Sequence, residues 1–262
     1  MKYLNDVDYK NCVGKIFKST NSGRFVIKNY TDKYTVEIEF LITGYKTVCG
    51  MSDIRTGKVK DYQIPSVYGV GITGDKYSPT YKDVFGNRKI RPEYSIWRGL
   101  LNRCYNESSR EKYPTYESCY VSENFKHYEY FYEWCNNQIG FGNTGWALDK
   151  DLLIKGNKIY SEDTCVFLPQ ELNNLLVKNN KSRGQYPIGV SYHKTNKKFT
   201  ATCGRGNSTV MTVGFFNTPE EAFYAYKKAK EDFIKEQALK WKDKIDPRAF
   251  QALMNYQVDI ND

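Results

Sequence analysis

Apolar and polar residues alternate near the start of the chain. The segments 24–30, 34–43 and 45–52 place β-branched and aromatic residues at every second position. That period is typical of strands with one buried face. Glycine, asparagine and aspartate residues, which favour turns, separate the segments. We therefore expect a small β-barrel domain over residues 1–85.

The apolar spacing changes to three or four residues in the next part of the chain. This helical period predicts helices over 92–106 and 122–140, the second with Ser122 as its N-cap. The β-rich run "TCVFLP" (164–169) and a further helix follow. We expect these elements to form one module over residues 86–180.

Residues 186–241 show first the two-residue period of strands and then the helical spacing of three or four residues. Alternation predicts three strands, and the helix that follows has a capping box formed by Thr218 and Glu221. We expect this segment to fold on its own as a sheet packed on one helix, within a module of residues 181–262. The chain as a whole is thus predicted to be an α+β protein of three modules. The strands are expected at 188–193, 198–204 and 209–216, and a last short helix at 247–256.

Alternation also assigns the two faces of this predicted sheet. Apolar residues belong against the helix, and the polar residues between them then face outward. The residues expected to face the helix are Val190, Tyr192, Phe199, Ala201 and Cys203. Those expected on the open face are Ser191, His193, Lys198, Thr200 and Thr202.

The chain is basic, and its basic residues are unevenly distributed. Lys and Arg number 39 against 30 Asp and Glu, which gives a net charge of +9 and favours a polyanionic partner. Between Leu172 and Pro219 there is no acidic residue. A polar, basic sheet face of this kind suits the major groove and the phosphates of double-stranded DNA. The residues expected to contact DNA are Lys178, Lys181, Arg183, Ser191, His193, Lys194, Lys197, Lys198, Thr200, Thr202, Arg205 and Thr212.

The seven cysteines are widely spaced and include no CxxC pair, so a cysteine-based zinc site is not expected. Reduced, buried thiols are typical of intracellular proteins. The start of the chain lacks the apolar core of a signal peptide, and no run is apolar enough for a membrane span. We therefore expect a cytoplasmic protein without membrane association. For a phage-encoded protein this would be the cytoplasm of the host cell.

Part of the third module resembles a known DNA-binding domain. The segments "GVSYHKTNKKFTATC" and "VGFFNTPEEAFYAYKKA" are similar to the plant APETALA/ethylene-response type, and more closely to the versions appended to phage homing endonucleases. The resemblance implies a sheet that binds DNA. The plant family reads bases with Arg and Trp, whereas we expect mainly phosphate contacts here. The matching positions of this chain are Ser191, His193, Thr202, Gly204 and Thr212.

The middle module resembles the HNH, or ββα-metal, nucleases of phages. The resemblance lies in "LDKDLLIKGNKIYSEDTCVFLPQELNNL" and in the helices before it. It implies a divalent ion, Mg²⁺ or Mn²⁺, bound by Asp149 and by Asn174 or its neighbour Asn173. It also implies catalytic roles for Asn157 and for Lys150, which stands where the family has its general-base histidine.

Other residues could take the place of that histidine. His127 precedes the motif on a predicted helix and is a candidate base, with an ordinary surface histidine as the alternative. Tyr160 is a further candidate, because it lies near the motif. From the residues alone, Asp149 and Asp151 could also simply face solvent around a turn.

Two functions therefore stay open. The chain could be a metal-dependent endonuclease that cuts or nicks DNA, acting as a monomer on the duplex. It could instead be a DNA-binding regulator or counter-defence factor with a dead nuclease centre, because a protonated lysine is a poor general base. RNA binding is less expected, since the aromatic strand motif of RNA-binding sheets is missing.

Overall fold

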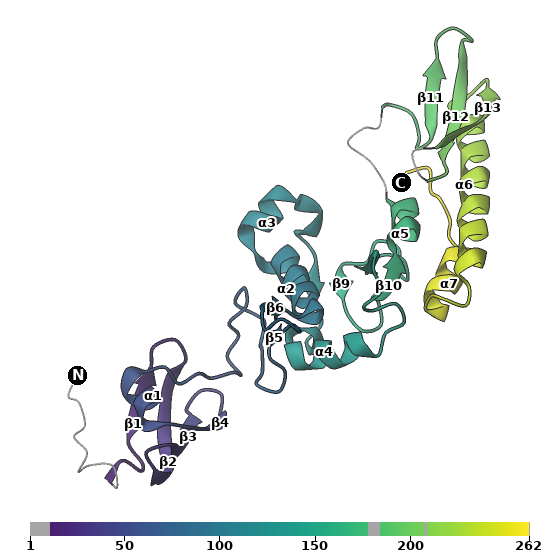
Figure 1. Ribbon diagram of the computed structural model, residues 1–262. Helices are drawn as coiled ribbons and strands as arrows, with labels where there is room; N and C mark the ends of the chain where they lie inside the picture. The colour runs from purple at the N-terminus through teal and green to yellow at the C-terminus, as the bar shows by residue number, and fades with distance from the viewer. Residues whose placement is uncertain (1–10, 178–183, 207–208, 262) are drawn as a thin grey trace. The chain divides into compact units, whose positions relative to one another are not determined.

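The computed structural model describes residues 11–177, 184–206 and 209–261 (Figure 1). The protein is a mixed α+β structure with several small sheets. It divides into two compact units: unit 1 consists of residues 1–114 and 123–132, and unit 2 of residues 115–122 and 133–262. Residues 86–180, which we expected as one module, contribute to both units.

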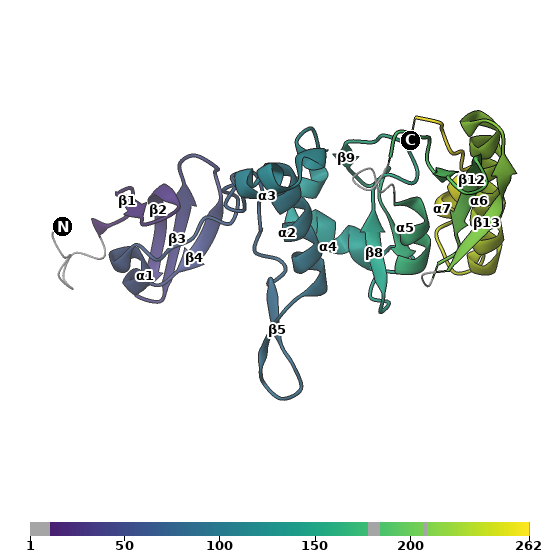
Figure 2. The same ribbon diagram turned by 90° about the horizontal axis from the view of Figure 1, so that it is seen from above.

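Unit 1 begins with an open antiparallel sheet. Its elements are β1 (Ile16–Ser19), β2 (Gly23–Asp32), β3 (Thr35–Phe40), β4 (Lys46–Cys49) and the helix α1 (Met51–Thr56). The strands pair in sequence order, and no sheet in the described residues closes into a barrel. The barrel expected over residues 1–85 is therefore wrong. The segment 45–52 explains the difference, because the chain leaves the sheet after Cys49 and forms α1, which lies along one side of the sheet (Figure 2).

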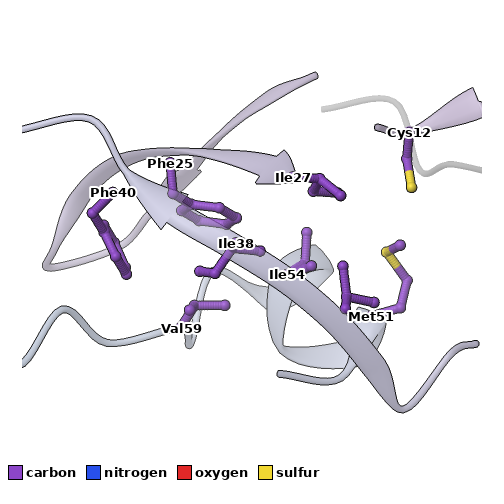
Figure 3. Close-up of a cluster of buried hydrophobic side chains, with 9 residues drawn as sticks. Cys12, Phe25, Ile27, Ile38, Phe40, Met51, Ile54 and Val59 are labelled. Atoms are coloured by element: carbon purple, nitrogen blue, oxygen red, sulfur yellow. The ribbon is translucent and has the colours of Figure 1, made fainter. Parts of the chain in front are cut away.

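The apolar core of this sheet shows why a helix can replace further strands. Alternation along β2 and β3 directs Phe25, Ile27 and Ile38 into one cluster (Figure 3). Met51 and Ile54 of α1 join that cluster and are only 2% and 3% exposed. Burying an apolar side chain of this size contributes about 1.5–3 kcal/mol. The helix therefore covers apolar surface that a closed barrel would otherwise have to bury.

A helix-rich part completes unit 1. The helix predicted over 92–106 is confirmed as α2 (Pro92–Tyr105), and a short helix, α3 (Glu107–Lys112), follows it. Trp97 of α2 is fully buried, and its indole N–H donates a hydrogen bond of 2.7 Å to the Phe125 carbonyl. This bond ties α2 to the segment that precedes the next helix.

The second predicted helix begins later than expected. It is α4 (Tyr128–Asn136), and the residues before it form a 3₁₀ turn, η3 (Asn124–Lys126). Ser122 does not cap this helix, because its hydroxyl is hydrogen-bonded to the Glu162 carboxylate at 3.1 Å. The predicted N-cap at Ser122 is therefore wrong.

Short elements link these larger parts. Between α1 and α2 the strands β5 (Thr80–Lys82) and β6 (Arg88–Ile90) pair as a separate hairpin, which no apolar period predicted. A 3₁₀ turn, η2 (Pro114–Tyr116), follows α3.

Unit 2 contains a strand–strand–helix element. Its parts are β8 (Trp146–Asp149), β10 (Val166–Pro169) and α5 (Gln170–Leu176), and a small parallel pair is formed by β7 (Tyr120–Val121) and β9 (Ile159–Tyr160). β8 and β10 are antiparallel, and every residue of β10 is buried. β9 lies between β8 and β10 in the chain but pairs with β7, and α5 begins directly after β10.

The end of the chain forms the three-stranded sheet and helices that the sequence predicted. The elements are β11 (Val190–His193), β12 (Lys198–Gly204), β13 (Val210–Phe216), α6 (Pro219–Trp241) and α7 (Pro247–Met254). The strands pair antiparallel in the order β11-β12-β13, and the capping box of Thr218 and Glu221 opens α6. None of the helices in the described ranges has the length and apolar character that a membrane crossing requires.

The helix α6 packs on two cores. Its first half supplies Ala222 and Phe223 to the core beneath the three-stranded sheet. Its second half supplies Ile234 and Ala238 to a core that contains Leu168 of β10 and parts of α5 and α7. An isolated segment 186–241 would expose this second set of residues, which argues against the independent folding that we expected.

Candidate functional site

Asp149 is the last residue of strand β8. Its Oδ1 accepts hydrogen bonds from the Asp151 N–H at 2.9 Å and from the Leu152 N–H at 2.8 Å. Burial raises the pKa of the Asp149 carboxyl, although these two bonds act in the opposite direction. One carboxylate oxygen is thus already used to form the turn that follows the strand.

Lys150 is a buried part of the loop between the two strands. It is 6% exposed, and its ammonium donates to the Asp151 Oδ1 and, at 2.9 Å, to the Asn157 carbonyl oxygen. The ammonium also lies 5.6 Å from the centre of the Tyr160 ring, which is itself buried. In this arrangement the Lys150 side chain joins Asp151 to the carbonyl group of Asn157 within the loop.

Asn157 uses its whole side-chain amide within the same loop. Its Nδ2 donates to the carbonyl oxygens of Lys150 and Ile159, both at 2.7 Å. Its Oδ1 accepts from the Ile159 N–H at 3.1 Å. The side chain is 9% exposed. Asn157 therefore joins the two ends of the loop, and its oxygen is engaged.

The two asparagines of α5 differ in position. Asn174 is exposed, and its Oδ1 accepts a hydrogen bond from the Gln170 side chain at 2.8 Å. Asn173 is half-buried and lines an open groove of about 1590 Å³ together with Asp149 and Asp163. The structure thus places Asn173, and not Asn174, along the same groove as Asp149.

The hydrogen bonds of these side chains show which of their oxygens are already engaged and so bear on whether they can bind a divalent ion. Mg²⁺ prefers several oxygen ligands in a near-octahedral arrangement. One oxygen of Asp149 accepts hydrogen bonds in a turn, the Asn174 Oδ1 accepts from Gln170, and the buried ammonium of Lys150 donates to Asp151. Within the described ranges, no cluster of three or more His, Cys, Asp or Glu residues could hold a metal ion. Two of the predicted ligand oxygens, the Asp149 Oδ1 and the Asn174 Oδ1, thus already accept hydrogen bonds within the chain.

The two histidines lie in different units. His127 is exposed and belongs to unit 1, whereas the β8–β10–α5 element belongs to unit 2. His193 is exposed on β11; its Nδ1 accepts from the Asn196 N–H at 3.3 Å, and its ring meets the Phe215 ring edge-on at 5.4 Å. His193 is thus part of the three-stranded sheet.

The outer face of β11–β13 is polar and basic, as alternation predicted. Pairing places Ser191 opposite Thr200 and His193 opposite Lys198. A register shift after Ala201 pairs Thr202 with Thr212 and leaves the apolar residues of β12 against α6. The exposed members of the expected DNA-contact set are Ser191, His193, Lys194, Lys197, Lys198 and Thr212. Thr202 is half-buried, and Lys178, Lys181 and Arg183 lie outside the described residues.

Three residues of this sheet differ from expectation. Thr200 is only 6% exposed, and its hydroxyl has no hydrogen-bond partner. The guanidinium of Arg205 lies over the Phe233 ring of α6 at 4.9 Å and 3.8 Å from the Glu236 carboxylate, so it is turned toward the helix. Tyr192 pairs with the helix-facing Phe199 but is 42% exposed, because β11 is an edge strand.

Sequence reasoning missed Phe215, which is 44% exposed and paired with Thr200. The double aromatic "FF" could have signalled it, since two consecutive strand residues point to opposite faces. Phe216 belongs to the core beneath the sheet, which leaves Phe215 on the outer face.

Function is inferred from the chemistry and placement of these residues. A search with protein-family models gave no match for this chain, and comparisons with curated proteins and with solved structures gave none either.

Proposed function

We propose that this protein binds double-stranded DNA through the outer face of β11–β13. The observation that carries the proposal is the exposed basic group of Lys194, Lys197 and Lys198 on a stretch without any carboxylate from Leu172 to Pro219. Lysines beside hydroxyl side chains can bind phosphates, and a sheet of this size can enter the major groove. The opposite face is closed by α6, so the outer face is the one that can meet a partner.

We further propose that β8, β10 and α5 are a degenerate form of the HNH-type element. Their chain order and antiparallel pairing support the relationship. The buried, hydrogen-bonded state of Lys150 and Asn157 supports a structural role for the loop. In this proposal the element stabilises unit 2 and does not cleave the bound DNA.

Lys197→Ala combined with Lys198→Ala tests the DNA-binding face. We expect weaker binding to duplexes of any sequence, because phosphate contacts carry no sequence information. Each lost phosphate contact should reduce the slope of log affinity against log salt by about 0.9, so the pair should reduce it by about 1.8. Fluorescence anisotropy of labelled duplexes over a salt series measures both quantities.

A matched control uses two other lysines of the same unit. Lys228 and Lys240 lie on α6 and are paired with Asp232 and Glu236. Replacing both with alanine removes the same charge, but should leave affinity and salt slope close to wild type. If the two double variants behave alike, the DNA-binding face lies elsewhere.

The second candidate function is metal-dependent cleavage, and the groove shared by Asp149 and Asn173 is the observation that favours it. We expect no nicking of supercoiled plasmid by wild type in Mg²⁺ or Mn²⁺. Lys150→His should not create activity, because it removes both donor bonds of the buried ammonium. Nicking by wild type that disappears in Asp149→Ala would contradict the structural role and establish the endonuclease.

A further inference from the structure

The β5–β6 hairpin is a separate two-stranded sheet of unit 1. Its pairs are Thr80 with Ile90, Tyr81 with Lys89 and Lys82 with Arg88. All residues of β6 are exposed, and within the described residues the hairpin pairs with no other strand. Figure 2 shows it projecting away from α2. A hairpin with so little buried surface contributes little to folding, and its residues are free to meet a partner.

The tip of this hairpin carries two apolar side chains in water. Val84 is 93% exposed and Phe85 is 85% exposed, more than any other large apolar side chain in the described parts of the chain. The turn that presents them is tightly bonded. The Asp83 Oδ1 accepts from the Phe85 N–H at 3.0 Å and the Asn87 N–H at 2.8 Å, and Gly86 supplies the positive φ of 80°. The apolar pair is therefore held outward by a defined turn.

The base of the hairpin is also held in place. The Arg91 Nε donates to the Ser78 carbonyl oxygen at 3.0 Å, and its guanidinium lies over the rings of Tyr81 and Tyr132. Tyr77 stacks on Tyr132, with 3.9 Å between the ring centres. These contacts join both ends of the hairpin to α4. A partner therefore meets a preorganised arm, which reduces the entropy lost on binding.

The charges of the hairpin indicate the chemistry of that partner. Lys82 and Arg88 are directly opposite one another just behind the tip. Like charges in a cross-strand pair destabilise a free hairpin, whereas an anion between them removes the repulsion. Lys89 lies 3.9 Å from the Asp83 carboxylate, which also accepts hydrogen bonds in the turn, so the charges of Lys89 and Asp83 offset one another. Basic flanks with an apolar tip match a polyanion that also offers apolar surface.

We propose that the β5–β6 hairpin is a DNA-deforming arm. Lys82 and Arg88 contact phosphates on the two sides of a minor groove, and Phe85, together with Val84, wedges between adjacent base pairs. Apolar wedges flanked by basic residues unstack a base step and kink the duplex, and the exposed apolar pair becomes buried in exchange. This inference rests on the proposed function only in taking duplex DNA as the partner, since it concerns unit 1 and not the sheet of unit 2.

The test uses the full-length chain and a duplex of alternating thymine and adenine, whose flexible steps are the easiest to unstack. Some adenines are replaced by 2-aminopurine, which becomes brighter when it is unstacked, and the two ends carry dyes that report bending. Wild type should raise the 2-aminopurine signal and shorten the distance between the ends. The double variant Val84→Ser and Phe85→Ser should lose both signals. Its affinity should fall about tenfold, within the range for loss of a base–aromatic contact, with an unchanged salt slope.

Ile42→Ser is the matched control. Ile42 is 82% exposed in the turn between β3 and β4, so this variant removes an equally exposed apolar side chain from the same unit. It should bend and unstack DNA like wild type. Because all three side chains are exposed, neither variant should change the melting temperature, and a lost signal then reports a lost contact.

The outcomes separate this inference from the proposed function. If wild type binds duplex DNA without unstacking it, or the Val84/Phe85 variant retains both signals, the proposal that the hairpin deforms DNA is wrong. The Lys197/Lys198 variant still tests separately whether the outer face of β11–β13 binds DNA. If wild type instead binds phosphatidylserine vesicles through Val84 and Phe85 without unstacking DNA, the partner is a membrane surface and the arm is overturned. Absence of binding to any duplex overturns both proposals.

Discussion

Gly140→Ala is expected to lower the free energy of unfolding of unit 2 by about 3 kcal/mol, whereas Gly142→Ala should lower it by about 1 kcal/mol. Both glycines have a positive φ, 91° and 81°, and lie in the same turn before β8. A methyl group at Gly140 would overlap the Trp146 ring, but at Gly142 it would meet no atom within 4 Å. The difference between the variants therefore measures the packing around Trp146 alone.

Trp146 explains why this overlap should be costly. It begins β8 opposite Pro169 of β10, and its ring meets the Trp241 ring of α6 edge-on at 5.7 Å. Moving the ring would disturb the strand pair and the helix together. Denaturant unfolding followed by tryptophan fluorescence measures the loss, because Trp134, Trp146 and Trp241 all lie in unit 2. Equal effects of the two variants would mean that the Trp146 ring moves aside easily.

Asn157→Ala is expected to lower the free energy of unfolding by about 3 kcal/mol, and Asn174→Ala by less than about 0.5 kcal/mol. Asn157 makes three hydrogen bonds inside the loop between β8 and β10. Its loss removes the amide donor to the buried Lys150 carbonyl oxygen, whereas the Ile159 carbonyl oxygen keeps the Thr164 hydroxyl as a donor. Asn174 makes one exposed bond to Gln170 on its own helix. The same type of substitution should thus have very different effects.

This pair of variants also separates a structural from a catalytic asparagine. Urea unfolding gives the stability, and plasmid nicking in Mn²⁺ gives any activity. A structural Asn157 changes the first measurement strongly and the second not at all. If Asn157→Ala unfolds at the same urea concentration as wild type but abolishes a cleavage activity, our interpretation of the loop is wrong.

Elements with a local signal were predictable from the sequence. The strands β11–β13 alternate clearly, and the capping box of Thr218 and Glu221 marks the start of α6 by itself. The barrel was wrong because closure depends on pairing between distant strands, which alternation does not report. The helix α1 has six residues, too few to show a helical period, so the alternation over 45–52 predicts a strand where α1 begins.

The sequence indicated which residues of the candidate site to compare, but not their contacts. Asp149 ends a strand, and Asn173 and Asn174 lie on a helix. The burial of Lys150 and the bonds of Asn157 depend on how the loop closes on itself. The orientation of Arg205 likewise depends on a contact with Glu236, which is 31 residues further along the chain. The β5–β6 hairpin shows no alternation of apolar and polar residues, because every residue of β6 is exposed.

The double packing of α6 has a consequence for the synthesis of this protein. Leu168 and Leu172 leave the ribosome well before the residues that cover them, Ile234, Ala238 and Leu253. Completing that cover requires roughly 80 further residues, or about 4 to 16 s of translation at ordinary rates. During that time the nascent chain presents an unfinished apolar surface on which holding chaperones can act. The second unit can thus reach its final form only after nearly the whole chain has been made.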